Sequence, residues 1–287
     1  MSLEFIRKTE LSDLKALSVF NQVLQIPALK GQDWNVTSPD VIEKVMVMTY
    51  DVLENQDPLK EEKSSLNRRL MDQYEAFETM VNDARDPLKM AIKIATLGNA
   101  IDIMVSGDFS HLQSKIREKT GNQIHEKNFQ QLKKQLGETR RLVYFGDNAG
   151  EIVLDKLLIS TLKKLYDLEV AFVVRSTPTL NDVTLPEAKD IGMHEVAQVL
   201  ENGIEGPFPG TRLSRCSSEV QDLFRQADLV ISKGGGNFDS LDEDKALHNQ
   251  NISFLLLSKC HLYEQLFHTP LEAPILSNYY KDRENLN

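Results

Sequence analysis

The sequence predicts an α/β fold with a parallel sheet that follows a helical region. Two observations support this prediction. Residues 1 to about 115 place apolar side chains at helical spacing, and the remainder holds four short apolar runs with helical stretches between them. Strands that alternate with helices are typical of βαβ units and a parallel sheet. We therefore expect a helical domain over 1–115 and an α/β domain over 116–287.

The helical region contains two segments with an amphipathic pattern, 11–24 and 38–53. Two further helices are expected to start at Asp57-Pro58 and at Asp86-Pro87. Aspartate can cap a helix, and proline tolerates the first helical position because its missing N–H is not needed there. The second start opens a strongly apolar helix. Residues 116–138 are rich in lysine and glutamine, and they predict an exposed connecting helix.

The α/β region begins with a short apolar run. Continuous apolar runs of this kind are expected for strands that are buried on both faces of a parallel sheet. The clear strands are 142–145, 170–174, 229–232 and 253–257, with a further candidate at 196–200. The helices between them are expected at 152–166, at 185–191 and from a Ser217 cap to about 226.

Composition excludes several classes of protein. The 287 residues are 41% hydrophobic and 26% charged, which is typical of a globular protein. A net charge of −10 argues against a general nucleic-acid binder. The two cysteines, Cys216 and Cys260, form no CxxC pair, so we expect free thiols rather than a zinc site or disulfide. Without an apolar leader or a run of about 18 apolar residues, the expected location is the cytoplasm, with no membrane partner.

The first strand ends in a turn that could hold a cation. Asp147 and Asn148 lie between Gly146 and Gly150, and Glu151 follows at the start of a helix. Ligands of open α/β sheets bind outside the carboxyl ends of the strands. Oxygen-bearing side chains there are candidate ligands of a hard cation. The alternative is an ordinary helix N-cap, for which aspartate and asparagine are also preferred.

Polar residues also follow the other clear strands. Parallel strands bring these ends to one edge of the sheet, where their side chains can converge. The second strand is followed by Arg175, Asn181 and Asp182, the third by Lys233, Gly234 to Gly236 and Asn237, and the fourth by Lys259.

Together these residues favour an oxyanion site. Asp147, Asn148 and Asp182 would hold a divalent cation that polarises a phosphoryl group. Lys233 and Arg175 would hold phosphate oxygens, and the backbone of the triple glycine could form an anion nest. The alternatives are a flexible glycine loop with a solvated lysine, a surface ion pair for the arginine and a surface position for Lys259.

Other well-known sites are not supported. The sequence has no P-loop, no GxGxxG after a strand, no GxSxG and no Asp-x-Asp after the first strand. Its six histidines show no HxH or HExxH spacing. In the apolar helix after Asp86, Gly98 is followed by Asn99 and Asp102, which share a helix face. On spacing alone a packing glycine with solvent-facing polar residues explains these three as well.

These motifs resemble the DUF89 damage-control phosphatases, which are metal-dependent enzymes that hydrolyse phosphometabolites. The resemblance spans about residues 50–265, although the CxxC segment near the start of many prokaryotic members is absent. The motifs that carry it are Asp147 to Glu151, Arg175 to Pro178 with Asn181-Asp182, Lys233-Gly234 with Asn237, and Lys259-Cys260. Asp57-Pro58 with Lys63 and Asn67, Asp86-Pro87, and Gly98-Asn99 with Asp102 resemble the stand-alone prokaryotic branch.

The resemblance implies an N-terminal helical region and a Rossmann-like three-layer α/β/α core. It implies a divalent metal on Asp147, Asn148 and Asp182, with Lys233 near the phosphate. It also implies that Asn99 and Asp102 line the same cleft. The cofactor would be Mn²⁺, Mg²⁺, Co²⁺ or Ni²⁺, and the substrates sugar phosphates or phosphorylated cofactor fragments.

We therefore predict a metal-dependent phosphomonoesterase, with Asp147, Asp182 and Glu151 as catalytic residues and Glu151 orienting the attacking water. The predicted phosphate- and substrate-binding residues are Lys233, Gly234, Asn237, Arg175, Asn99, Asp102 and Lys259. An aspartate nucleophile is the alternative to water. The alternative functions are an S-adenosylmethionine-dependent carboxyl methyltransferase and a non-catalytic metabolite-binding protein. The expected partner is a small phosphorylated metabolite, and a homodimer is one option for the oligomeric state.

Overall fold

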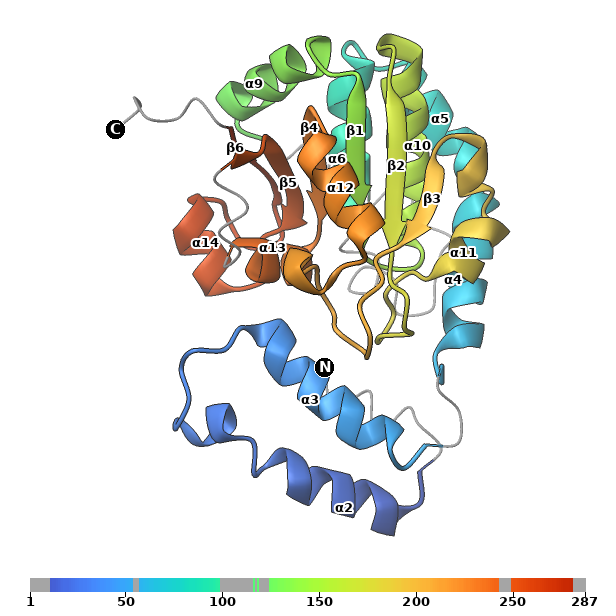
Figure 1. Cartoon of the computed structure of the whole chain (residues 1–287). Helices are drawn as coiled ribbons and strands as arrows, with labels where there is room; N and C mark the ends of the chain where they lie inside the picture. Colours follow the sequence, from blue (N-terminus) through green and yellow to red (C-terminus); the bar gives the residue numbers. More distant parts are fainter. Residues whose placement is uncertain are drawn as a thin grey trace.

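The computed structural model describes residues 11–53, 57–98, 116, 118, 124–242 and 249–280. Its centre is a six-stranded sheet with the order β3-β2-β1-β4-β5-β6 (Figure 1). Strands β1 to β5 pair in parallel, and β6 pairs antiparallel to β5. The strands are β1 (Arg141–Phe145), β2 (Glu169–Val174), β3 (Gln198–Glu201), β4 (Leu229–Lys233), β5 (Ile252–Leu257) and β6 (Pro274–Tyr279).

Helices cover both faces of this sheet, which confirms the predicted three-layer α/β/α core. One face is covered by α5 (Tyr74–Asn82), α6 (Pro87–Gly98), α9 (Glu126–Gly137), α10 (Glu151–Leu165) and α11 (Leu185–Asp190). The other face is covered by α12 (Ser218–Gln226), α13 (Gly235–Asp242) and α14 (His261–Phe267). Each layer buries its own apolar cluster, because the strands present alternate side chains to opposite faces.

The described part of the helical region is not a separate body throughout. Apolar residues of α5 and α6, among them Phe77 and Ile94, belong to the same buried cluster as Tyr144 of β1 and Leu158 of α10. These helices therefore form part of the layer over the sheet. The domain boundary at residue 115 stays a prediction.

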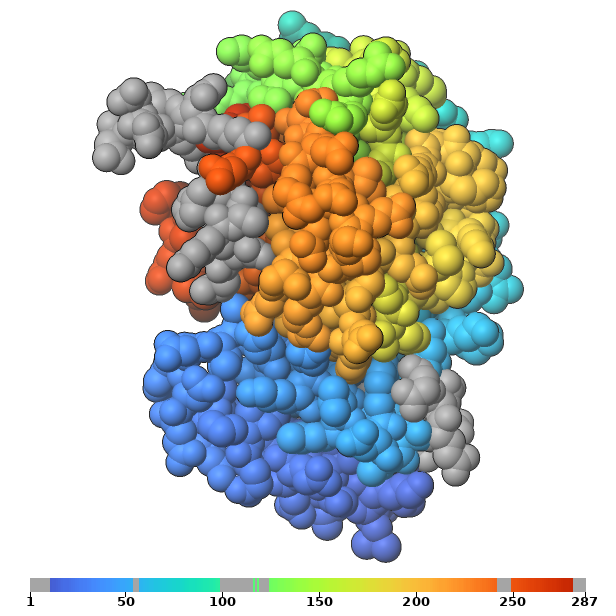
Figure 2. Space-filling view, viewed as in Figure 1, coloured from blue at the N-terminus to red at the C-terminus, as the bar shows by residue number. Residues whose placement is uncertain are grey.

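The first two described helices, α2 (Asp13–Val23) and α3 (Ser38–Tyr50), form a lobe at the carboxyl edge of the sheet (Figures 1 and 2). Ion pairs tie this lobe to the loop after β3, with Arg212–Asp40 at 3.0 Å and Arg215–Glu43 at 2.6 Å. The Tyr50 hydroxyl donates to the carbonyl of Pro178 at 2.9 Å. Helix α3 consequently lies over the strand ends that carry the predicted site.

Two local predictions need correction. Helix α4 (Lys60–Met71) begins after Leu59, and the Asp57 carboxylate pairs with Lys63 instead of capping the helix. The predicted helix start at Asp86-Pro87 is confirmed, because the Asp86 carboxylate accepts from the backbone N–H of Lys89 at 3.1 Å. Helix α9 is not simply exposed, since one of its faces is buried and contacts β6.

The antiparallel strand β6 was not predicted. Its sequence begins with Pro274 and contains Asn278, and both residue types are uncommon in strands. The position at the sheet edge tolerates the proline, and Asn278 accepts from Ser253 of β5 at 2.9 Å. Cys216 and Cys260 are free, as predicted. Within the described ranges, no helix combines the length and the apolar character needed to cross a membrane.

Candidate metal and phosphate site

The turns after β1 and β4 meet at the centre of the sheet. These two strands are neighbours, and the chain leaves them toward opposite sides, which is where ligands of doubly wound sheets bind. Gly234 follows β4 with a φ of +78°, and a Cβ atom on it would overlap the Asp147 carboxylate. The glycine therefore makes room for the carboxylate at the predicted site.

Backbone hydrogen bonds join the turn after β1 to the loop after β2. An antiparallel bridge pairs Asn148 with Asp182. The N–H of Ala149 donates to the carbonyl of Asn181, and the N–H of Val183 donates to the carbonyl of Asp147, both at 2.8 Å. The three side chains that were predicted to bind the cation are thereby brought to one place.

Both aspartates at this place have raised pKa values. Burial, together with the charges of Asp182 and Glu151, raises the pKa of the Asp147 carboxyl to about 8 against the opposing charges of Arg175 and Lys259. Burial also raises the pKa of the Asp182 carboxyl, and Arg175 opposes that shift. A bound divalent cation would favour the ionised form of both carboxyls.

The amide of Asn148 is oriented by two carboxylates. Its Nδ2 donates to Asp147 Oδ2 at 2.8 Å and to Glu151 Oε2 at 3.3 Å. The amide oxygen therefore remains available to a cation. No group of three or more His, Cys, Asp or Glu side chains that could hold a metal ion was found in the part of the chain that the structure describes. The candidate set is instead two carboxylates and one amide, which suits a hard cation that keeps open positions.

Arg175 lies beside both aspartates and is almost completely buried. Its Nε donates to Asp182 Oδ2 at 2.6 Å, and its Nη1 donates to the Gly210 carbonyl at 2.8 Å and to Asn237 Oδ1 at 2.9 Å. Its Nη2 lies 3.8 Å from Asp147 Oδ1 and has no hydrogen-bond partner among the described residues. A buried guanidinium with unused donors can bind an anion.

Lys233 is buried and faces the protein interior. Its ammonium donates to the Ala95 carbonyl at 3.0 Å, to Asp155 Oδ1 at 2.6 Å and to Glu151 Oε1. Burial lowers the pKa of Lys233, but the carboxylates of Asp155 and Glu151 outweigh that effect and raise it to about 12. The three donors of the ammonium are all in use. In this structure Lys233 therefore has no donor left for a phosphate.

Asn237 is likewise saturated. Its Nδ2 donates to the carbonyls of Gly146 at 3.0 Å and Lys233 at 2.8 Å. Its Oδ1 accepts from Arg175 at 2.9 Å and from Thr211 at 2.8 Å. Four hydrogen bonds are the full capacity of a side-chain amide. Asn237 thus holds the strand ends together, and its predicted contact with substrate would require one of these bonds to break.

The triple glycine is not a flexible loop. Helix α13 starts at Gly235, and the N–H of Gly234 donates to the Leu255 carbonyl of β5 at 3.0 Å. The first N–H groups of a helix have no intrahelical acceptor and attract anions. Gly235 and Gly236 present such groups next to Asp147, so an anion-binding role for this backbone stays a prediction.

Of the remaining predicted residues, the structure describes Lys259 but not Asn99 and Asp102. Asn99 and Asp102 lie outside the described residues. Gly98, the last described residue of α6, lies beside Glu151, because a Cβ atom on it would be 3.1 Å from Cγ of that glutamate. Lys259 is exposed, and its charge lowers the pKa of the Asp147 carboxyl. It is thus an exposed cation near the site.

Sequence reasoning did not assign three buried polar residues near the site. Asp155 joins Lys233 to the Tyr144 hydroxyl, which donates to it at 2.7 Å. Lys63 and Asn67 reach the site from α4, and only the family resemblance drew attention to them. An acidic pair at i and i+4 in the apolar helix α10, Glu151 and Asp155, was the available signal for the first.

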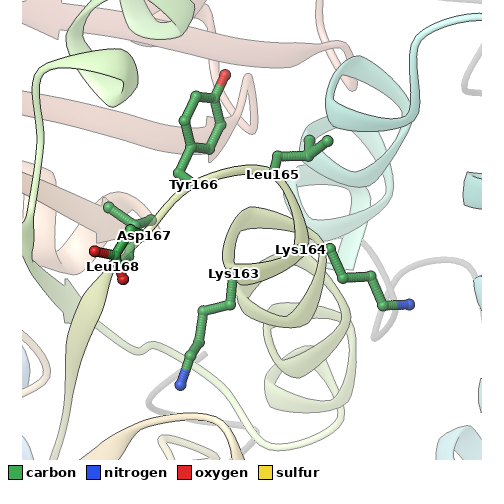
Figure 3. A pocket seen from close by; sticks show the side chains of 6 residues that line it. All are labelled: Lys163, Lys164, Leu165, Tyr166, Asp167 and Leu168. Atoms are coloured by element: carbon green, nitrogen blue, oxygen red, sulfur yellow. The ribbon is translucent and has the colours of Figure 1, made fainter.

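A hollow at the opposite edge of the sheet does not compete with this site. It is lined by residues 163–168, where α10 ends and β2 approaches (Figure 3). The Lys163 ammonium donates to the Val196 carbonyl at 3.0 Å, and Lys164 pairs with Glu78 at 2.9 Å. The lysines of this hollow are therefore occupied by protein groups.

Comparisons with known proteins find similar sequences over most of this chain. The model of the damage-control phosphatase ARMT1-like domain matches residues 19–273. An uncharacterised protein of Methanocaldococcus jannaschii is 31% identical over 210 residues, which cover 72% of this chain and 68% of that protein. Damage-control phosphatase PH1575 of Pyrococcus horikoshii is 26% identical over 219 residues, which cover 75% of this chain and 72% of that protein.

A damage-control phosphatase of Archaeoglobus fulgidus is 28% identical over 214 residues, which cover 74% of this chain and 72% of that protein. The crystal structure of a DUF89 family protein, PH1575 from Pyrococcus horikoshii, superimposes with a TM-score of 0.83. That alignment covers 96% of this chain and 94% of the other at 22% sequence identity. It shows that the two chains share a fold.

Proposed function

Because this chain belongs to the damage-control phosphatase ARMT1-like family, we propose that it is a divalent-metal-dependent phosphatase of small phosphometabolites. Relatives named damage-control phosphatase support a phosphatase role in damage control. The proposal adds the metal, the residues that hold it and the substrate class, which is phosphomonoesters such as sugar phosphates or phosphorylated cofactor fragments.

One observation carries the metal dependence. Asp147 and Asp182 are both buried, they come from neighbouring strand ends, and each lacks enough positive charge to keep its pKa in the ordinary range. Together with the amide oxygen of Asn148 they offer three oxygen ligands at one point. A bound Mg²⁺ or Mn²⁺ ion would supply Lewis-acid polarisation of the phosphoryl group.

Several positively polarised groups surround that point and can hold the phosphoryl oxygens. Arg175 Nη2 has two N–H donors without a hydrogen-bond partner among the described residues, and it lies beside Asp147. The first N–H groups of α13 and the exposed ammonium of Lys259 approach from the β4 and β5 side. Donors of this kind stabilise the negative charge of a phosphoryl group in transfer.

Glu151 is the candidate that orients the attacking water. Its Oε2 accepts from the Asn148 amide, and its Oε1 accepts from Lys233. Both contacts fix the carboxylate beside the proposed metal ligands. Lys233 then acts as a positioning residue for Glu151 and not as a phosphate ligand. Its positioning role follows from its three protein acceptors.

The methyltransferase alternative is not favoured. An S-adenosylmethionine site would need a glycine-rich turn at the first strand end that lets the cofactor pass closely. Here that turn carries Asp147, whose carboxylate fills the space up to Gly234, and Asn148, whose amide donates to this carboxylate. A non-catalytic metabolite-binding protein would likewise have no use for two buried aspartates at one point.

The experiment that tests the proposal is a phosphate-release assay after treatment with a chelator. Mg²⁺, Mn²⁺, Co²⁺ or Ni²⁺ is added back singly, and phosphate is measured over a panel of sugar phosphates and cofactor fragments. We expect release only with added metal. Release without metal would contradict the proposal, and methyl transfer from S-adenosylmethionine without phosphate release would favour the alternative.

A further inference from the structure

One face of α4 lies across both segments that carry the proposed metal ligands. Asn67 Oδ1 accepts from the backbone N–H of Gly150 at 2.5 Å, in the turn after β1. One turn earlier, the Lys63 ammonium lies 3.0 Å from Glu187 Oε1. Glu187 accepts from the N–H of Thr184 at 2.8 Å, just after Asp182. Helix α4 therefore contacts the Asn148 turn and the Asp182 segment together.

The contact with the first segment is close. Gly150 has a φ of +79°, and a Cβ atom on it would lie 2.7 Å from Cδ2 of Leu66. Leu70 also lies close to this Cβ position, and it is a neighbour of both Leu66 and Asn67 on the helix, because residues three and four apart are adjacent there. Packing therefore fixes the position of Asn67 at the start of α10.

The side-chain amide of Asn67 uses its oxygen atom but not its nitrogen atom in hydrogen bonds among the described residues. Gly150 supplies a donor, so the oxygen of the amide must face it and Nδ2 must point away. Asn67 is 2% exposed, and its Nδ2 has no hydrogen-bond partner in the part of the chain that is described. A buried donor without an acceptor is unfavourable, so native proteins almost always provide one. An acceptor from a bound molecule would remove the penalty.

The residues of this helix face act on the proposed metal site. The charge of Lys63 on the same helix face lowers the pKa of the Asp182 carboxyl. Asn67 itself binds Gly150, which follows Asn148 closely in the turn after β1, and Asn148 is bridged to Asp182. A phosphate ester held by the proposed cation would bring oxygen atoms to the segment that Asn67 contacts.

We propose that Asn67 is a substrate-binding residue whose Nδ2 donates to an oxygen atom of the phosphorylated substrate. This inference rests on the proposed function, because it takes the ligand to be a phosphate ester held at the metal. It places part of substrate recognition on α4, outside the loops that follow the strands. Unlike Asn237, whose amide is saturated, Asn67 has a donor to give.

Two variants separate this role from a structural one. Asn67→Asp, assayed at alkaline pH where its carboxyl is ionised, keeps an oxygen for the Gly150 N–H but has no donor, whereas Asn67→Ala loses both. Asn82→Ala, at an exposed asparagine of α5, is the matched control. Calorimetry measures binding of Mn²⁺ alone and then of inorganic phosphate to the Mn²⁺-loaded protein. Steady-state assays give KM and kcat for a hexose phosphate.

We expect both Asn67 variants to weaken ligand binding about 10-fold or more, which corresponds to about 1.4 kcal/mol. Asn67→Asp should keep the Mn²⁺ affinity and Tm of the wild type. A rise in Kd for inorganic phosphate identifies a phosphoryl oxygen as the acceptor, and a rise confined to the KM of the hexose phosphate identifies an oxygen of the alcohol. Either result supports the proposal, provided that Asn82→Ala behaves as wild type.

The contrary result is an Asn67→Asp protein that binds phosphate and hydrolyses the ester as the wild type does, while Asn67→Ala is impaired. Wild-type activity in Asn67→Asp, which keeps only the acceptor for the Gly150 N–H, would show that Asn67 only supports the Gly150 turn. A wild type that releases no phosphate but binds it would refute the proposed function, and the phosphate Kd of the variants would still decide the role of Asn67. A wild type that binds no phosphate would refute both.

Discussion

Gly234 and Asp147 are in direct contact across the two central strands, because a Cβ atom at position 234 would overlap Oδ2 and Cγ of the aspartate. The carboxylate after β1 thus occupies the space that a side chain after β4 would need. This contact joins the half of the site that would hold the cation to the half where α13 starts. We therefore expect the site to be sensitive to changes at Gly234.

Gly234→Ala should displace Asp147 and lower kcat/KM by about 10²-fold, because small displacements of reacting groups are costly. The φ of +78° adds a conformational cost of about 1 to 2 kcal/mol for alanine. The control is Gly137→Ala, where a Cβ atom would meet nothing within 4 Å. Steady-state kinetics and thermal unfolding measure both effects. Equal activity of the two variants would contradict the contact.

Lys233→Met should destabilise the protein strongly. The substitution leaves Glu151 and Asp155 buried without their cation, and breaking a buried pair costs roughly 3 to 5 kcal/mol. At roughly 2 to 4 °C for each kcal/mol, the Tm should fall by about 10 °C. Lys259→Met, at the exposed lysine, should keep its Tm. A Lys233→Met protein with the wild-type Tm and only a raised KM would instead identify Lys233 as a phosphate ligand.

The metal-free protein should lose stability as the pH rises from about 4 to about 8. Burial raises the pKa of the Asp147 carboxyl from 3.8 to about 8, so the folded state binds more protons than the unfolded state in this window. Stability is then greatest below the unfolded pKa and is lost as the pH passes the folded pKa. Asp147→Asn should show a shallower loss in urea titrations with chelator. If the free energy of unfolding changed with pH equally in the two proteins, the raised pKa of Asp147 would be contradicted.

Arg175→Lys should raise the KM for phosphate esters by about 10- to 100-fold, because hydrogen bonds to charged groups contribute about 1.5 to 3 kcal/mol. Lysine keeps the charge but cannot contact Asp182 and reach the Nη2 position as well. Arg225→Lys, in an exposed pair with Asp222, is the control. An Arg175→Lys enzyme with unchanged KM would remove the arginine from the phosphate site.

Much of the fold could be predicted from local patterns. The continuous apolar runs of β1, β2, β4 and β5 and the Ser217 cap of α12 are signals that depend on few neighbours. The strand β6 and the role of Asp57 depend on tertiary partners instead. Pro274 is tolerated only because β6 lies at the edge, and Asp57 turns to Lys63 because that ammonium is buried beside it.

The location of the site could be predicted from the sequence, but the roles of its individual residues could not. Parallel strands must bring Asp147, Asp182 and Gly234 to one edge, so their proximity followed from the topology. The sequence did not show that Lys233 points inward, because its acceptors include Asp155 and a backbone carbonyl of α6. It also did not show that Asn237 is saturated by groups from three other segments.

The most direct test of the metal site is the binding of Mn²⁺ to the wild type and to Asp182→Asn, measured by electron paramagnetic resonance after chelator treatment. The asparagine can still accept from Arg175, so the fold should be kept. Asp190→Asn, at an exposed aspartate of α11, is the matched control. We predict one Mn²⁺ ion per chain in the wild type and the control, and an affinity that is at least about 10-fold weaker in Asp182→Asn. Equal Mn²⁺ affinity in all three proteins would contradict this prediction.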